Sequence, residues 1–280
     1  MAKRSIPIIL LLIVLVYSLS RVFSGAWILP QSFSVGALTI HYYGIFMASA
    51  VAAGYLLAIK RAKNFGIQAD QADVIIFWLV IGGFVGARLY HVLSSIEYYS
   101  HHAIDIFKVW NGGLSIYGAV LSGLVCVLLF AKSYKLKALY LLDWLTPSLV
   151  LGQIIGRFGN FFNYELYGYP THLPWKMFVP VQFRGIAYQN NAFFHPLFLY
   201  EAIGNAIILF ILLKVLKKPL PGALFLWYVL LYNVLRFFLE FLRIQSTIAF
   251  GLRINAYVSL VLAIAAVALL WRRSTYAKIS

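Results

Sequence analysis

Cysteine and acidic residues are the scarcest chemical groups in this 280-residue chain. There is one cysteine, Cys126, in an apolar stretch, so no internal disulfide can form and a metal site built on several thiolates is excluded. We interpret Cys126 as a packing residue. Charged residues make up 11% of the chain and hydrophobic residues 62%, which leaves too little polar surface to cover a soluble globule. The composition therefore predicts an integral membrane protein.

The few acidic residues leave a large excess of positive charge. Asp and Glu number 8 against 23 Lys and Arg, which gives a formal net charge of +15. In a soluble protein such a balance would suggest a nucleic-acid partner, but here the basic residues form short clusters between apolar runs. That pattern encodes membrane topology and attraction to anionic lipid. We therefore expect no nucleic-acid partner, and neither a metal nor another cofactor.

Long apolar runs are what the chain has in abundance. About 20 mostly apolar residues are enough to cross a bilayer as a helix. A shorter run at residues 6–22 follows two basic residues. The predicted core spans are residues 40–59, 74–94, 113–131, 138–158, 196–215, 221–241 and 254–271. We therefore expect an all-α polytopic membrane protein with a seven-helix transmembrane core.

Clusters of lysine and arginine orient this bundle, because these residues concentrate on the cytoplasmic side of a membrane. They follow alternate spans, at residues 60–63, 132–137, 214–218 and 272–278, and two more basic residues stand at the N-terminus. All of the clusters then fall on one face. We assign that face and the C-terminus to the cytoplasm, and the other connections to the extracytoplasmic side.

Two segments lie outside the core spans. Residues 1–25 fit either an extra N-terminal helix or a cleaved signal peptide, because small residues at Ser24 and Ala26 follow a basic start and a short apolar stretch. We favour the extra helix. The aromatic-rich connection at 163–195, between the fourth and fifth core helices, predicts a small extracytoplasmic head at the membrane interface. With no repeat or linker, residues 1–280 are predicted to form a single integral membrane domain.

Ionisable residues inside the predicted spans gather at one end of the bundle. Such a group at membrane depth is costly and is a functional-site candidate by default. Arg236 and Glu240 share one helix face at i,i+4 spacing and are expected to pair. A guanidinium suits bidentate phosphate recognition, so we predict a site for an anionic lipid headgroup below the outer interface. The residues near the outer ends are Arg88, Arg157, Glu201, Arg236, Glu240 and Arg243.

Some polar and glycine positions have simpler explanations. For Arg243 or Arg253 alone, snorkelling of a long side chain to the interface is the favoured interpretation. Asp143 is interpreted as a helix-start carboxylate or a buried hydrogen-bond partner. The pair Gly112 and Gly113 predicts a break in the helix at the outer interface, which is tolerated only beside protein or a wet cavity.

Six sequence blocks carry a resemblance to a known family. They are HYYGI at 41–45, GARLY at 86–90, WNGGLSIYG at 110–118, GRFGNFFNYELYG at 156–168, HPLFLYE at 195–201 and YNVLRFFLEFLR at 232–243. In these blocks and their order the chain resembles the bacterial prolipoprotein diacylglyceryl transferases, and residues 156–168 match the family's signature.

The resemblance implies a reaction, its partners and a location. A diacylglyceryl group would pass from phosphatidylglycerol to the lipobox cysteine thiol of a prolipoprotein, forming a thioether and releasing glycerol phosphate. This is the first step of bacterial lipoprotein maturation. The implied partners are phosphatidylglycerol, prolipoprotein signal peptides with a lipobox cysteine, and membrane lipid. The implied location is the bacterial cytoplasmic (inner) membrane, with the active site facing the outer leaflet.

The resemblance also assigns residues. Arg157 is expected to bind the lipid phosphate with Asn160 beside it, and Arg236 is expected to be required for catalysis. Tyr43 matches a functional tyrosine of the family. Gly118 and Gly168 match functional glycines. The remaining candidates for substrate binding are Asn163, Glu165, Glu240, Arg243 and Arg88.

The group that removes the thiol proton stays open at this point. Some family members carry a histidine before the glycine at position 118, where this chain has Tyr117. A phenol of pKa about 10 is a poor base for a thiol of pKa about 8.5. Either Tyr117 orients or hydrogen-bonds the substrate, or another group such as His195 or Glu201 takes the proton, or nearby arginines favour the thiolate.

Two other classes of protein compete with the transferase. A transporter or channel for an anionic solute or lipid would predict charges spread through the depth of the bundle, often with inverted repeats. Here the charges gather at one end and no repeat is found. A lipid-binding scaffold without chemistry is separated from an enzyme only by an acceptor assay.

Overall fold

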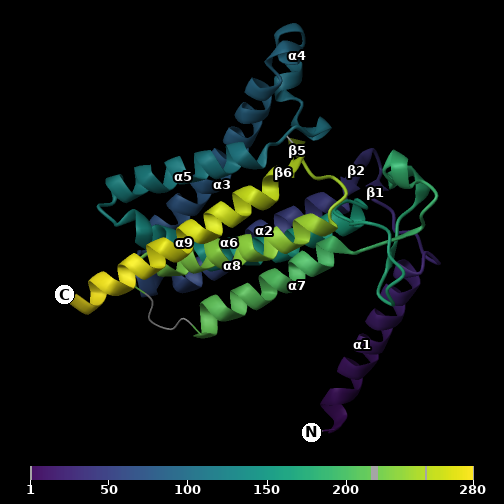
Figure 1. Cartoon of the computed structure of the whole chain (residues 1–280), viewed down its shortest axis with the longest axis horizontal. Helices are drawn as coiled ribbons and strands as arrows, with labels where there is room; N and C mark the ends of the chain where they lie inside the picture. The colour runs from purple at the N-terminus through teal and green to yellow at the C-terminus, as the bar shows by residue number, and fades with distance from the viewer. Residues whose placement is uncertain (1, 216–219, 250, 280) are drawn as a thin grey trace. The chain divides into compact units, whose positions relative to one another are not determined.

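The computed structural model describes residues 2–215, 220–249 and 251–279, which are mostly helical (Figure 1). Within this part of the chain, seven helices are long and apolar enough to cross a membrane. They are α2 (Tyr42–Ala62), α3 (Ala69–Ser94), α5 (Ile116–Ser133), α6 (Ala138–Phe162), α7 (Leu197–Phe210), α8 (Ala223–Leu242) and α9 (Ile254–Ile279). Helix α7 continues into a π-helical turn at Ile211–Val215, and this continuation brings its span to Lys214. Each corresponds to one predicted core span, so the all-α polytopic fold is confirmed. Lys217 and Lys218 of the predicted basic clusters lie outside the described residues.

Shorter elements connect these helices. Helix α1 (Ala2–Phe23) precedes α2, and α4 (Ile96–His101) follows α3. Two-stranded antiparallel pairs lie in three of the connections. The pairs are β1 (Ser32–Val35) with β2 (Leu38–His41), β3 (Met177–Phe178) with β4 (Phe193–Phe194), and β5 (Ile248–Ala249) with β6 (Leu252–Arg253).

Local signals set several helix ends. A lipid environment has no water to satisfy backbone groups, so apolar runs fold as helices that bond internally. Helix α3 begins at a capping box in which Gln68 and Gln71 exchange side-chain and backbone bonds. Asp143 accepts bonds from the backbone N–H groups of Gly222 and Phe225, at 2.5 and 2.9 Å, where α8 starts. The interpretation of Asp143 as a buried hydrogen-bond partner is confirmed.

The predicted break at Gly112 and Gly113 is present, and it moves the start of the third span. Both glycines have positive φ, +88° and +78°, a region that glycine adopts without a steric penalty. Arg88 of α3 donates four bonds of 2.5–3.0 Å to backbone carbonyl oxygens of residues 105, 106, 112 and 113. The loop is thereby fixed, and α5 begins at Ile116 instead of 113.

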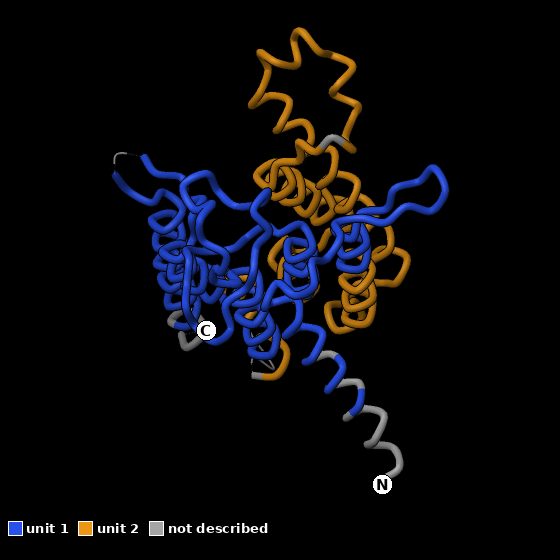
Figure 2. The backbone as a smooth tube through the Cα atoms, turned by 90° about the vertical axis from the view of Figure 1, so that its right-hand side faces the viewer, with its two compact units in different colours: residues 1–50, 150–211, 227–280 blue, residues 51–149, 212–226 orange. Residues whose placement is uncertain are grey.

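The backbone contacts divide the chain into two compact units (Figure 2). The first unit holds residues 1–50, 150–211 and 227–280, and the second holds residues 51–149 and 212–226. Each unit has its own buried cluster. The single domain predicted for residues 1–280 stays a prediction.

The second unit is built on close packing of α3 against α5. A Cβ atom added at Gly118 of α5 would overlap the backbone oxygen of Gly86 on α3, so the two helices approach at their backbones, as small residues allow in membranes. Ile75 and Trp144 are fully buried in the core of this unit. The indole of Trp144 donates to the carbonyl oxygen of Ala58 at 2.8 Å.

The first unit contains the connection between α6 and α7, residues 163–195, which we call the head. Its core is aromatic: Tyr164, Tyr167 and Phe194 are buried together with Phe198 of α7. The Tyr167 hydroxyl also donates to the carbonyl oxygen of Phe183 at 2.6 Å. The segment is therefore an ordered structure on the end of the helices, while its extracytoplasmic location stays a prediction.

The end of α1 packs into the same aromatic core. Val22 is buried, and the rings of Phe23 and Phe161 lie 5.9 Å apart. Gly25 follows with φ +79° against the ring of Phe178 in β3. Residues 16–25 thus belong structurally to the first unit. The interpretation of residues 1–25 as a retained extra helix stays a prediction.

Candidate active site

Arg157 lies near the end of α6 with its side chain mostly buried. Its Nη2 is 2.5 Å from Oε1 of Glu201, and its Nη1 donates to Oδ1 of Asn160 at 3.1 Å. A quarter of the side-chain surface is exposed, and the buried Nε has no partner among the described residues. The guanidinium is therefore fixed on one side and retains donor capacity on the other.

Glu201 joins the three helices that form the site. It lies in α7 with only 2% of its surface exposed. Its Oε1 accepts bonds both from Arg157 of α6 and from the hydroxyl of Tyr232 of α8, the second at 3.1 Å. A buried carboxylate is tolerated when it is paired and hydrogen-bonded. The segments of α6, α7 and α8 in the first unit are therefore joined by this side chain. Figure 1 shows these three helices as neighbours.

One face of α8 carries the second arginine. Tyr228, Tyr232, Arg236 and Glu240 recur every four residues and share that face. Nη2 of Arg236 lies 2.6 Å from Oε2 of Glu240, so the predicted pair is confirmed. Glu240 is fully buried, and its Oε1 accepts a bond from the side chain of Asn255 at 3.2 Å. The carboxylate thus holds Arg236 while being held from α9.

Glu165 holds the two signature asparagines. Its carboxylate oxygens accept from the side-chain amides of Asn160 and Asn163, at 3.1 and 3.3 Å. The backbone N–H of Glu165 also donates to the carbonyl oxygen of Asn160 at 2.9 Å. Because Asn160 in turn accepts from Arg157, one continuous polar network runs from Glu201 to Glu165.

Gly168 closes the signature by a tight backbone approach. Its N–H donates to the carbonyl oxygen of His195 at 2.9 Å, and it forms an isolated β-bridge with Arg243. A Cβ atom placed there would meet the carbonyl oxygen of Leu242 at 2.5 Å. Any larger residue would separate the head from the end of α8, so the glycine is required by packing.

Arg253 corrects the snorkelling interpretation. Its Nη1 donates to the carbonyl oxygens of Glu240 and Arg243 and to the hydroxyl of Ser246, and its Nη2 donates to the hydroxyl of Tyr169. These bonds tie the chain after α8 to the head. Arg253 does not snorkel, because acceptors inside the protein satisfy its guanidinium better than a long reach to the interface. For Arg243, burial and then the charge of Arg236 lower the pKa.

His195 belongs to a separate hydrogen-bond chain. Its Nδ1 lies 3.1 Å from the hydroxyl of Tyr200, which accepts from the indole of Trp175 at 2.7 Å. Burial lowers the pKa of His195 below its ordinary value of 6.5, so the imidazole is neutral at pH 7. A neutral imidazole is a competent proton acceptor.

Tyr43 stands at the start of α2 beside the signature helix. A Cβ atom on Gly159 would lie 3.0 Å from Cδ2 of Tyr43. The ring of Tyr43 therefore occupies the space left by the missing side chain of Gly159, the residue that precedes Asn160. The first unit thus brings Tyr43 to the turn of α6 that carries the Arg157 network.

Three predicted site residues belong to the second unit. The four hydrogen bonds of Arg88 described above all go to backbone carbonyl oxygens. Tyr117 is 61% exposed at the start of α5, with its ring 6.0 Å from that of Tyr90. Gly118 provides the close approach of α3 and α5. The roles predicted for these residues in binding and catalysis stay predictions.

Sequence reasoning missed several polar residues on the helices that carry the network. Gln153 donates to the hydroxyl of Tyr228 at 2.9 Å, and Asn255 donates to Glu240. Asn205 is fully buried, and neither polar atom of its side chain has a partner among the described residues. The detectable signal was helical spacing, since Gln153 precedes Arg157 by four residues and Asn205 follows Glu201 by four.

The fold and the site define a multi-pass membrane protein with a buried network of arginines and glutamates at the ends of three spans. A sequence model of the prolipoprotein diacylglyceryl transferase family matches residues 30–272. The chain belongs to this family.

Named relatives agree with the family match. A protein of Acaryochloris marina is 43% identical over 235 residues, which cover 83% of this chain and 86% of the relative. A protein of Thermotoga petrophila is 41% identical and covers 87% of this chain and 85% of the relative. One of Synechococcus elongatus is 38% identical and covers 86% of both. Each is named phosphatidylglycerol–prolipoprotein diacylglyceryl transferase.

Proposed function

We propose that this chain transfers the diacylglyceryl group of phosphatidylglycerol to the lipobox cysteine thiol of prolipoproteins. The family match and the names of the relatives support this reaction. The structural observation that carries the proposal is the pair of arginines, Arg157 and Arg236, each held by a buried glutamate. Guanidinium groups preorganised in this way suit the phosphate of a lipid substrate.

The reaction makes one bond and breaks one. The cysteine sulfur, as thiolate, attacks the glycerol carbon that carries the phosphate ester, and a carbon–sulfur bond forms. The carbon–oxygen bond to phosphate breaks, and glycerol phosphate leaves with the electron pair. Charge therefore builds on the departing phosphate in the transition state. Donors fixed in a low-dielectric site stabilise such charge without reorganising.

We assign binding of the substrate phosphate to Arg157. Glu201 is assigned to positioning the Arg157 guanidinium. The Glu201 carboxylate uses one guanidinium edge, which fixes the direction of the remaining donors. Asn160, which is held by Glu165, accepts a bond from Nη1 of the Arg157 guanidinium and so fixes its other side. Asn163 acts through the same carboxylate. The substrate phosphate then meets a donor set whose orientation is already settled before binding.

Arg236 is assigned to the developing charge of the leaving group, with Glu240 as its positioning residue. The pair lies on one face of α8, and Asn255 fixes the second carboxylate oxygen. Arg243 adds positive potential at the end of the same helix. Gly168 keeps that end close to the head, and Tyr43 lines the turn of α6 beside the signature. Arg88 and Gly118 shape the loop and helix start that present Tyr117.

Three residues are candidates for a role at the substrate thiol. Oε1 of Glu201 is already bound by a guanidinium and a hydroxyl, so this carboxylate is engaged in holding Arg157. His195 is neutral at pH 7 because burial lowers its pKa. Tyr117 is an exposed phenol suited to orienting the substrate. Among these, His195 meets the chemical requirement for a base most directly.

The site is proposed to face the outer leaflet of the bacterial cytoplasmic membrane, with the C-terminus in the cytoplasm. The distribution of lysine and arginine over the connections supports this orientation. The site then receives both substrates from the same leaflet: phosphatidylglycerol, and the prolipoprotein with its lipobox cysteine. The transporter alternative has no support in the family match.

An acceptor assay tests the proposed function. The purified full chain is reconstituted in vesicles of phosphatidylglycerol and phosphatidylcholine with a synthetic lipobox peptide, and the peptide is analysed by mass spectrometry. We expect a thioether-linked diacylglyceryl peptide, and none in vesicles of phosphatidylcholine alone. The Acaryochloris marina relative serves as the positive control. Absence of product under conditions in which that relative is active would refute the transferase and leave a scaffold.

A further inference from the structure

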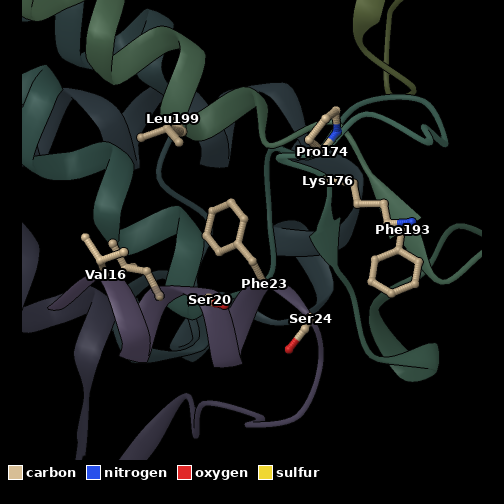
Figure 3. A pocket seen from close by; sticks show the side chains of 9 residues that line it. Val16, Ser20, Phe23, Ser24, Pro174, Lys176, Phe193 and Leu199 are labelled. Atoms are coloured by element: carbon tan, nitrogen blue, oxygen red, sulfur yellow. The ribbon is translucent and has the colours of Figure 1, made fainter. Parts of the chain in front are cut away.

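The end of α1 forms a pocket with the head and the start of α7 (Figure 3). Its volume is about 460 Å³, within the range of about 300–1,000 Å³ that ligand sites occupy. The lining residues come from all three elements: Val16, Leu19, Ser20, Phe23 and Ser24, then Pro174, Lys176 and Phe193, then Leu199. The family match covers residues 30–272, so the α1 side of the pocket lies outside the matched residues.

The pocket has an apolar end and a cationic end. In Figure 3, Val16, Leu199 and the ring of Phe23 lie on one side, and Lys176 and Phe193 lie on the other. The ammonium of Lys176 is 4.5 Å from the centre of the Phe193 ring. No Asp or Glu is among the lining residues described. The pocket therefore pairs apolar surface with one positive charge that no lining carboxylate neutralises.

The pocket adjoins the ends of two candidate membrane spans. Leu199 is in the first turn of the span that begins at Leu197. Phe23 contacts the ring of Phe161, next to the end of the span at Phe162. Both markers place the pocket at the boundary between a membrane-spanning segment and the aqueous side, where basic pockets on membrane proteins bind lipid headgroups.

We propose that this pocket is a binding site for an anionic phospholipid, separate from the Arg157 site. One acyl chain lies along Val16, Leu19, Phe23 and Leu199, and Lys176 pairs with the phosphate. A wholly apolar occupant, such as the helix of a signal peptide, would leave the Lys176 charge unpaired in an apolar setting, which is costly.

Photolabelling tests the proposal on the full chain reconstituted in vesicles. Two probes carry the same diazirine-bearing acyl chain, one with a phosphatidylglycerol and one with a phosphatidylcholine headgroup, and the labelled peptides are mapped by mass spectrometry. We expect the phosphatidylglycerol probe to label residues 16–24 at least about five times more than the phosphatidylcholine probe. Equal labelling by the two probes, or no labelling of these residues, overturns the proposal.

Variants separate the charge from the apolar surface. Lys176→Gln is expected to lower phosphatidylglycerol labelling to the phosphatidylcholine level, whereas Lys176→Arg keeps it. Ser20→Trp, which fills the pocket, is expected to lower labelling by both probes. Lys60→Gln, an exposed lysine at the end of α2, is the matched control and leaves labelling unchanged. Unchanged labelling in Lys176→Gln, with thermal unfolding like that of the parent, overturns the assignment.

Two further arms distinguish this site from the proposed active site. The double variant Arg157→Leu with Glu201→Leu, which removes the arginine without leaving a buried carboxylate unpaired, is expected to keep the labelling of residues 16–24, because the pocket does not use that arginine. Labelling that disappears in this variant, with thermal unfolding like that of the parent, would instead place the lipid in the active site. An excess of unlabelled lipobox peptide is expected to leave the labelling intact. Displacement by the peptide would make the substrate's apolar helix the occupant and overturn the phospholipid assignment.

Discussion

At the scale of single residues, the two arginines proposed to bind phosphate are each held by a carboxylate. Glu201 holds Arg157, and Glu240 holds Arg236. A membrane protein gains little by burying charge for stability alone, since a buried pair often does no better than apolar residues of the same volume. We therefore propose that the pairs orient the guanidinium groups toward a phosphate.

Arg157 carries the first prediction. Arg157→Ala should lower transfer at least about 100-fold, the scale seen when a donor to developing charge is removed. It also leaves Glu201 buried without its partner, which costs about 3–5 kcal/mol. The double variant Arg157→Leu with Glu201→Leu should recover thermal stability without recovering transfer. Transfer restored along with stability would show that the arginine acts only in folding.

Tyr117 gives a second test, because its exposed ring makes both variants compatible with folding. Tyr117→Phe should lose a substantial part of the activity, since the hydroxyl that orients the substrate is gone. Tyr117→His should retain some activity, because imidazole can donate, accept and take a proton. Initial rates with saturating lipobox peptide measure both. A fully active phenylalanine variant would remove the hydroxyl from the chemistry.

His195 predicts a dependence on pH. Burial lowers its folded pKa below 6.5, so the unfolded chain binds the proton more readily, and stability falls as pH drops from about 7 toward the folded pKa. Thermal unfolding across this range should show that loss in the parent and less of it in His195→Gln. As the thiol base, His195 would also give kcat/KM an acid limb below pH 6.5. If kcat/KM of His195→Gln shows the same acid limb as the parent, another group accepts the thiol proton.

At the scale of elements, glycines decide how closely helices approach. Gly118 and Gly123 lie on the same helix, α5, but a Cβ atom would overlap Gly86 only at Gly118, while nothing lies near Gly123. Gly118→Ala should therefore destabilise the protein by about 1–3 kcal/mol, as overpacking does. Gly123→Ala should be neutral or stabilising by up to about 1 kcal/mol, because alanine favours a helix more than glycine does. Equal melting temperatures would contradict this packing.

Elements were predictable where hydropathy alone decides them. The seven core helices follow from length and apolar content. The interpretation of Asp143 follows from its position near the start of its span, and the pair of Arg236 with Glu240 follows from i,i+4 spacing. The start of α5 was missed by three residues because Arg88, distant in sequence, fixes the preceding loop. The strand pair at 32–41 was missed because four-residue strands carry little periodic signal.

Tertiary contacts set the limit for the site as well. The sequence favours snorkelling for Arg253, because its sequence surroundings do not reveal the carbonyl oxygens that it meets in the fold. Gln153 and Asn205 look like ordinary polar residues until helical spacing aligns them with Arg157 and Glu201. The convergence of α6, α7 and α8 on one carboxylate is a property of packing.

At the scale of the whole molecule, the charge distribution predicts the orientation. In a background with Cys126→Ala, Asn190→Cys in the head should react with a membrane-impermeant maleimide added to intact cells. Lys137→Cys, at the opposite ends of the spans, should react only after permeabilisation, because its cluster marks the cytoplasmic side. Both side chains are exposed. The reverse pattern would place the Arg157 network on the cytoplasmic side.

The whole molecule contains the part of the chain that matches the family and a helix that precedes this part. The family match covers the helices that hold Arg157, Glu201 and Arg236, whereas α1 precedes it and lines the pocket proposed to bind lipid. On the two proposals together, the protein binds phospholipid at two places. The Arg157 site would carry out the transfer, and α1 with the head would hold a second lipid.

The stoichiometry of the reaction tests the central claim most directly. The purified chain is incubated with phosphatidylglycerol vesicles and a lipobox peptide, and released glycerol phosphate and thioether peptide are quantified together. We predict one glycerol phosphate for each thioether, and neither product with a peptide whose lipobox cysteine is replaced by serine. Glycerol phosphate released without the thiol, or no thioether while the related enzyme forms it, would contradict the account.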